Sequence, residues 1–190
     1  MIEIISDEAF ERVKLILHGV PNGAEKALYG IISRATTTIK KVSLQGITTV
    51  YDIKPGAIKE NTAIKLKTQK ADGGVVGTIH YSGVRIPLYR FAVSPKQPRQ
   101  GATVRARQRR DRAMTVFQNA FVARMRSGHV GIFERDTRRR TPISEIMAVS
   151  TAQMAADSGV MRKAEEAAQE TIVKRTEHEI HRILQGFGVR

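Results

Sequence analysis

The period of the hydrophobic pattern changes twice along this chain, and the order of the changes limits the folds that it can adopt. Apolar residues recur every three or four positions over 24–42 and again over 160–184, a spacing typical of amphipathic helices. Between these stretches, Ala63, Ile64 and Leu66 interleave with lysines, as in a half-exposed strand. Helices at both ends of a strand-rich middle predict an α+β fold, and short turns between the strands predict antiparallel pairing.

Boundary signals divide the chain into three parts of one predicted domain spanning 1–190. Residues 1–50 are predicted to be helical, with a break at Pro21-Asn22-Gly23, and Pro55 is suited to the start of one further helical turn. Residues 62–149 are predicted to form a central antiparallel sheet with basic loops. Residues 151–186 are predicted to form the C-terminal helices, a short one followed by a long one. Ser150 is a suitable N-cap for the short helix.

Turn residues predict how the strands of the middle part pair. Asp72-Gly73-Gly74 and Ser82-Gly83 would make residues 62–92 an antiparallel meander. Two further strand pairs are expected, 103–107 with 114–117 and 121–125 with 130–133. A last strand is expected over 143–149.

Composition excludes several classes of protein. The chain of 190 residues is 41% hydrophobic and 26% charged, which is typical of a globular domain. It contains no cysteine, and this excludes disulfides, zinc ribbons and thiol nucleophiles. Residues 1–7 lack the basic start of a signal peptide, and no apolar stretch approaches 18 residues, so neither secretion nor a membrane partner is expected. No cofactor motif is present, because Gly73-Gly74 lacks the spacing of a phosphate-binding loop.

Positive charge is concentrated in the segment 96–140. The segment has thirteen Lys/Arg and three Asp/Glu, a formal excess of +10 out of +14 for the whole chain. Two loops within it, 105–112 and 138–140, are expected to be exposed and to meet either an assembly partner or DNA. The arginines of these loops are the candidate contact residues: Arg105, Arg107, Arg109, Arg110, Arg112, Arg138, Arg139 and Arg140.

Three histidines are candidates for chemical roles. His129 follows Ser127 by two residues, but a serine nucleophile also needs a shaped turn and an oxyanion hole. A histidine that holds a loop or contacts a neighbour is the favoured interpretation. His178 and His181 share a helix face without an identifiable third ligand, so a solvated face is favoured over a metal site. No catalytic residue and no metal site are predicted.

Several motifs in a fixed order resemble one protein family. They include Tyr51-Asp52-Ile53-Lys54, Ile86-Pro87-Leu88 and Arg140-Thr141-Pro142-Ile143-Ser144-Glu145. The central run, 121–135, contains the turn residues Arg124, Ser127, Gly128, His129, Gly131 and Phe133. Over nearly the full chain, the sequence resembles the tailed-phage minor tail protein Z family, the lambda-type tail-completion or neck proteins.

The resemblance implies a non-enzymatic, structural role in a virion. It implies a subunit that completes the tail or the head–tail junction, assembled in the host cytoplasm, with the tail tube, terminator or connector as partners. A homo-oligomeric ring is the expected assembly, with sixfold symmetry favoured, and contact with packaged DNA stays open. The alternative from the residues alone is a nucleic-acid-binding module that uses loops 105–112 and 138–140.

Overall fold

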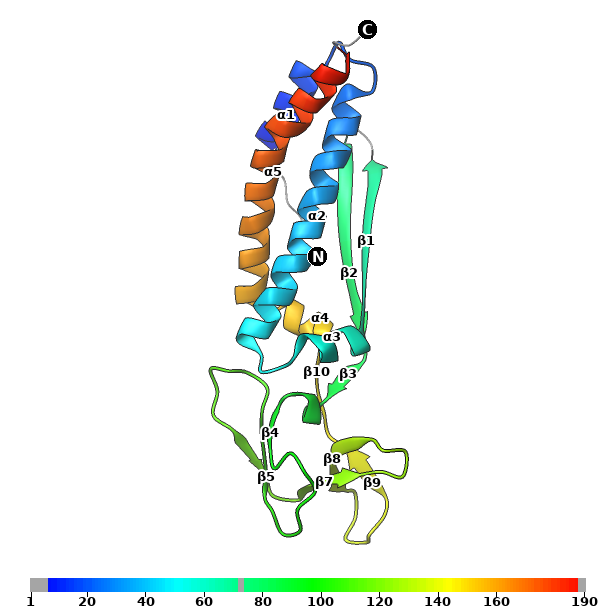
Figure 1. Cartoon of the computed structure of the whole chain (residues 1–190), viewed down its shortest axis with the longest axis vertical. Helices are drawn as coiled ribbons and strands as arrows, with labels where there is room; N and C mark the ends of the chain where they lie inside the picture. The colour runs from blue at the N-terminus through cyan, green and yellow to red at the C-terminus, as the bar shows by residue number, and fades with distance from the viewer. Residues whose placement is uncertain (1–6, 72–73, 188–190) are drawn as a thin grey trace. The chain divides into compact units, whose positions relative to one another are not determined.

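The computed structural model describes residues 7–71 and 74–187 (Figure 1). The chain groups into two compact units, each built from separated segments. Unit 1 comprises Met1–Gly46, Ile64–His80 and Asp157–Arg190, and unit 2 comprises Ile47–Ala63 and Tyr81–Ala156. The predicted α+β class is confirmed. The organisation as a single domain stays a prediction.

Unit 1 is built around three helices. They are α1 (Asp7–Ile16), α2 (Gly23–Val50, which ends in unit 2) and α5 (Ser158–Phe187). The predicted apolar stripes meet in one buried cluster: Val13, Leu17, Ala27, Leu28, Ile31, Ala35, Ile172, Ile180 and Ile183. The α1 helix lies along α5 (Figure 1), and Arg12 forms an ion pair with Glu177 there. Burial of these two stripes against each other and against Val13 and Leu17 is the main source of stability in this unit.

A two-stranded hairpin, β1 (Thr62–Ala71) and β2 (Gly74–Gly83), covers the helices of unit 1 with one face. Its first and last few residues belong to unit 2. Val75 packs against the large cluster, and Ile79 packs against a second cluster of Ile39, Ala164 and Ala168. The predicted pairing of these strands is confirmed. The predicted turn residues Asp72 and Gly73, and residues 1–6, lie outside the described part of the chain.

Unit 2 contains short strands in three small antiparallel sheets, as far as the described residues show. One sheet joins β4 (Ala92–Ser94), β5 (Val104–Arg107) and β6 (Thr115–Phe117). A second joins β7 (Ala120–Arg124), β8 (Val130–Arg135) and β9 (Ile143–Glu145). The third pairs β3 (Arg85–Pro87) with β10 (Met147–Ser150). The predicted strand pairs within 103–117 and 121–133 are therefore confirmed.

Helical segments complete unit 2. The turn predicted after Pro55 is α3 (Pro55–Asn61), with the proline in its first turn. The 3₁₀ helix η1 (Leu88–Arg90) follows β3. The short helix α4 (Thr151–Ala155) is capped by Ser150. The Ser150 hydroxyl accepts a hydrogen bond from the backbone N–H of Gln153, and the Gln153 side chain accepts one from the Ser150 N–H in a capping box. The predicted N-cap is confirmed.

Two details of the predicted strand order are wrong. The meander over 62–92 ends at β2, because β3 pairs with β10 from the far end of the strand-rich region. The single strand predicted over 143–149 is two strands. They separate at Ile146, whose N–H donates to the Ile132 carbonyl of β8 while its carbonyl accepts from Leu88. Local alternation of residues encodes strands but not their partners, so the change of sheet at Ile146 was invisible in the sequence.

Candidate functional site

Unit 2 carries most of the positive charge of the protein. It contains seventeen Lys/Arg and six Asp/Glu, a formal excess of +11 out of +14. The basic segment 96–140 lies wholly within it, and Lys54, Lys59, Arg85 and Arg90 add to it from outside that segment. A compact unit of this charge attracts polyanions or acidic surfaces.

The loop between β5 and β6 is anchored to the chain that follows α2. The Asp52 N–H donates to the Gln108 carbonyl over 2.8 Å, and the Arg110 N–H donates to the Val50 carbonyl over 2.9 Å. Tyr51 forms a β-bridge with Arg109 between these bonds. Backbone hydrogen bonds from a distant segment therefore anchor the loop that was predicted to be exposed. Arg105, Arg110 and Arg112 are exposed, as predicted, whereas Arg107 and Arg109 are half-buried.

Three of the predicted contact arginines have internal partners. Arg107 donates to Asp52 Oδ2 through Nη2 over 2.6 Å, and Arg110 Nη1 lies 3.6 Å from the other oxygen of this carboxylate. The Arg109 guanidinium lies 5.4 Å from the centre of the Tyr51 ring and donates to Asp111. The Arg109 hydrogen bond lowers the pKa of Asp111. These arginines hold the loop in place, whereas Arg105 and Arg112 are exposed without an ion pair to any described residue.

The second basic loop presents its side chains to solvent, as predicted. Arg138, Arg139 and Arg140 are all exposed, and no ion pair joins them to the described residues. The Arg140 carbonyl accepts a 2.7 Å hydrogen bond from Arg135, and the Thr137 hydroxyl accepts one from the Arg139 N–H. The backbone of this loop is therefore ordered while its three guanidinium groups stay open to a partner.

The turn within the run 121–135 is closed by its own backbone. Met125 N–H donates to the His129 carbonyl over 2.7 Å, and Gly128 N–H donates to the Met125 carbonyl over 2.9 Å. Gly128 has φ of +84°, a conformation that glycine adopts without the steric cost of a Cβ. Arg124, Arg126 and Ser127 are exposed around this turn.

The remaining motif residues form one interlocked cluster. His129 Nε2 lies 2.8 Å from Glu145 Oε1 of β9, and the imidazole meets the buried Phe133 ring edge-on at 6.3 Å. A Cβ on Gly131 would lie 3.0 Å from Glu145 Cδ and 3.1 Å from Phe133 Cε2. Glycine at 131 thus leaves the space through which Glu145 reaches His129. The spacing Gly-His-x-Gly-x-Phe is explained by packing of β9 onto the β7–β8 hairpin.

The contacts of His129 involve both the turn and β9. The Ser127 hydroxyl contacts the backbone N–H of His129 at 3.5 Å, and the ring nitrogen Nε2 is engaged by Glu145. The contact with Glu145 joins His129 to β9, and its role in holding a loop stays an interpretation. His178 and His181 are both exposed on α5, as predicted for a solvated face.

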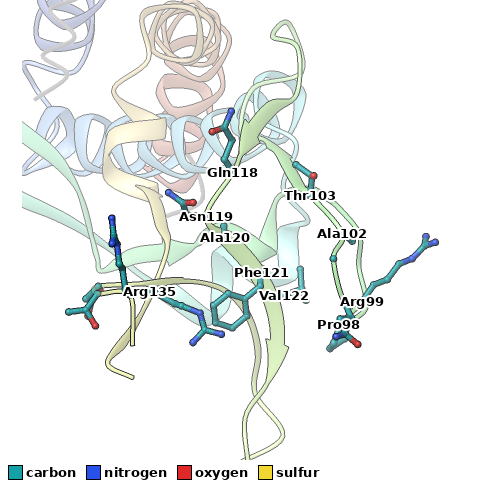
Figure 2. Close-up of a pocket in the computed structure, with 15 residues that line it drawn as sticks. Pro98, Arg99, Ala102, Thr103, Gln118, Asn119, Ala120, Phe121, Val122 and Arg135 are labelled. Carbon is teal, nitrogen blue, oxygen red and sulfur yellow. The ribbon is translucent and has the colours of Figure 1, made fainter. Parts of the chain in front are cut away.

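Unit 2 contains a groove of about 1090 Å³ (Figure 2), and one of its lining residues, Phe121, packs against Phe133 of this cluster. It is lined by the loop before β5, the start of β7 and the segment from Arg135 to Arg138. Figure 2 shows Arg135 close to the Phe121 ring, whereas Arg99 lies farther along the lining with its side chain extending away from Phe121. Sequence reasoning missed this groove, although the predicted pairing of 121–125 with 130–133 would have placed Arg135 diagonally across from Phe121.

The described residues offer no group of three His, Asp or Glu side chains that could hold a metal ion. Within the same residues, each helix is too short or too polar to cross a bilayer. The basic surface and groove of unit 2 are therefore the candidate site.

No family model, no curated protein and no solved structure matches this chain.

Proposed function

We propose that this protein is a structural component of a tailed-phage virion, a subunit that completes the tail or the neck. The observation that carries the proposal is the interlocked cluster of His129, Gly131, Phe133 and Glu145. The motif that resembles the tail-completion proteins is used here to fix β9 against a hairpin, with Arg124 and Arg126 displayed at its turn. Such a rigid, charged module suits an assembly contact.

The charge of unit 2 supports the same proposal. An isolated subunit with an excess of +11 in one unit repels other copies of that unit. Assembly next to acidic neighbours or DNA supplies the missing countercharge. We infer a ring of subunits, with six copies favoured, at the tail tube, terminator or connector.

The test is a virion made without the protein. Deletion of its reading frame is expected to leave heads and tails but to remove finished, infectious particles, and the wild-type chain supplied from a plasmid should restore them. Cryo-EM of the restored particles would count the copies and identify their neighbours. Normal infectious particles that lack the protein would refute the proposal.

A free-standing nucleic-acid-binding module is the second candidate. The exposed, ion-pair-free Arg138, Arg139 and Arg140 favour it among the described residues, but Arg107, Arg109 and Arg110 are engaged internally. Such a module predicts DNA binding without any effect of the deletion on particle assembly. The same deletion therefore separates the two candidates.

A further inference from the structure

The walls of the groove in unit 2 carry cations from separate segments. Arg99 comes from the loop between β4 and β5, Arg135 from the end of β8, and Arg138 from the following loop. All three arginines are exposed, and no described residue forms an ion pair with any of them. Gln100, Gln118 and Asn119 add neutral amide groups to the lining.

Arg135 is held in place before any ligand arrives. Its guanidinium lies 5.1 Å from the centre of the Phe121 ring, and Nη1 donates to the Arg140 carbonyl over 2.7 Å. Asp136, the one acid among the described lining residues, accepts hydrogen bonds from the Ser144 hydroxyl at 2.8 and 2.9 Å. An arginine fixed by an aromatic ring and a carbonyl is a preorganised anion contact, because little rotamer freedom is left to lose on binding.

The groove favours a backbone contact over base stacking. Phe121 is its one aromatic lining residue among those described. One face of that ring is covered by Arg135, and the ring also packs at 6.3 Å against Phe133. Proteins that hold single strands combine a basic groove with open aromatic platforms, whereas arginines and amides without such platforms suit the phosphates of a duplex.

We propose that this groove binds the phosphate backbone of duplex DNA without sequence preference, through Arg99, Arg135 and Arg138. A duplex is favoured over an acidic peptide because it supplies about one negative charge per 1.7 Å, enough to neutralise the excess of the whole unit. This proposal names duplex DNA as a partner of the proposed virion protein. It rests on the proposed function only in taking that DNA to be the packaged DNA of the phage. It also moves the predicted contact from loop 105–112 to the groove.

The experiment measures binding of the full chain to a fluorescein-labelled duplex of about 30 base pairs by fluorescence anisotropy, over about 50 to 200 mM salt. The groove variant is Arg99→Ser/Arg138→Ser, which spares the Phe121–Arg135 contact. The matched control is Arg124→Ser/Arg126→Ser, which removes the same charge from exposed positions in unit 2 outside the groove. Circular dichroism spectra would establish that both variants fold.

The groove variant is expected to bind the duplex at least about tenfold more weakly than the wild type. The slope of log K against log salt concentration should also be smaller in magnitude by roughly 1.8, the value for about two lost phosphate contacts. The control is expected to lose less than about threefold, the effect of reduced long-range attraction. Equal losses in the two variants, or no duplex binding at about 50 mM salt, would overturn the proposal. So would tighter binding of a single strand of the same length, or displacement of the duplex by poly-glutamate at equal charge concentration. None of these binding results decides whether virions assemble without the protein, so the two proposals fail separately.

Discussion

Replacement of Gly131 by alanine tests how the motif cluster is built. The new Cβ would overlap Glu145 Oε1 and lie 3.1 Å from Phe133 Cε2. Glu145 would have to move away from His129, and the lost hydrogen bond is worth about 0.5–1.5 kcal/mol. Crowding of the buried Phe133 ring adds about 1–3 kcal/mol. Replacing glycine within a strand stabilises the protein by about 0.5–1 kcal/mol, so the net loss in the free energy of unfolding is expected to be about 0.5–4 kcal/mol.

The effect of this substitution should also depend on its neighbour. In a Glu145→Ala background, the overlap and the hydrogen bond are both absent. Gly131→Ala should then cost about 1 kcal/mol less than in the wild type, a coupling typical of residues in contact. Gly56→Ala is the control within unit 2, because nothing lies within 4 Å of the position that its Cβ would take and alanine favours the helix.

Tyrosine fluorescence during urea unfolding is a suitable assay. The chain has no Trp and four Tyr, of which Tyr51, Tyr81 and Tyr89 belong to unit 2. With a urea dependence of about 1–3 kcal/mol per M, the midpoint should fall by about 1 M. If Gly131→Ala costs the same with and without the Glu145 side chain, the proposed packing is wrong.

Three further predictions address other parts of the molecule. Ile172→Ala, in the fully buried core of unit 1, should lower the free energy of unfolding by about 2–5 kcal/mol in a urea titration followed by far-ultraviolet circular dichroism; a loss below about 1 kcal/mol would contradict the core assignment. Asp52→Ala removes the carboxylate that binds Arg107, and it should cost about 1–3 kcal/mol and speed amide hydrogen exchange in the loop after β5; unchanged exchange would show that the backbone bonds alone hold this loop. Because the Arg109 hydrogen bond lowers the pKa of Asp111, Arg109→Ala should raise that pKa in an NMR titration. The lowered pKa contributes stability above the ordinary pKa of the carboxyl, lost as the pH falls through the folded value; an unchanged pKa in the variant would contradict the assigned cause.

Local patterns in the sequence predicted most of the secondary structure. The stripes over 24–42 and 160–184 lie in α2 and α5 because helix burial follows a period set by the backbone itself. The cap at Ser150 and the turn at Gly128 were predictable for a similar reason, since both depend on the chemistry of adjacent residues. The concentration of positive charge was visible directly by counting residues.

The partners of those elements were decided by the tertiary structure. Nothing near residue 146 shows that its N–H bonds to β8 and its carbonyl to Leu88. Nothing near 105–112 distinguishes Arg107, which binds Asp52 across 55 positions of the chain, from the exposed Arg112. A sequence determines helix periods, caps, turns and total charge because these arise within a few residues. Folding brings distant segments together, and only then is it decided which arginines form internal ion pairs and which line a groove.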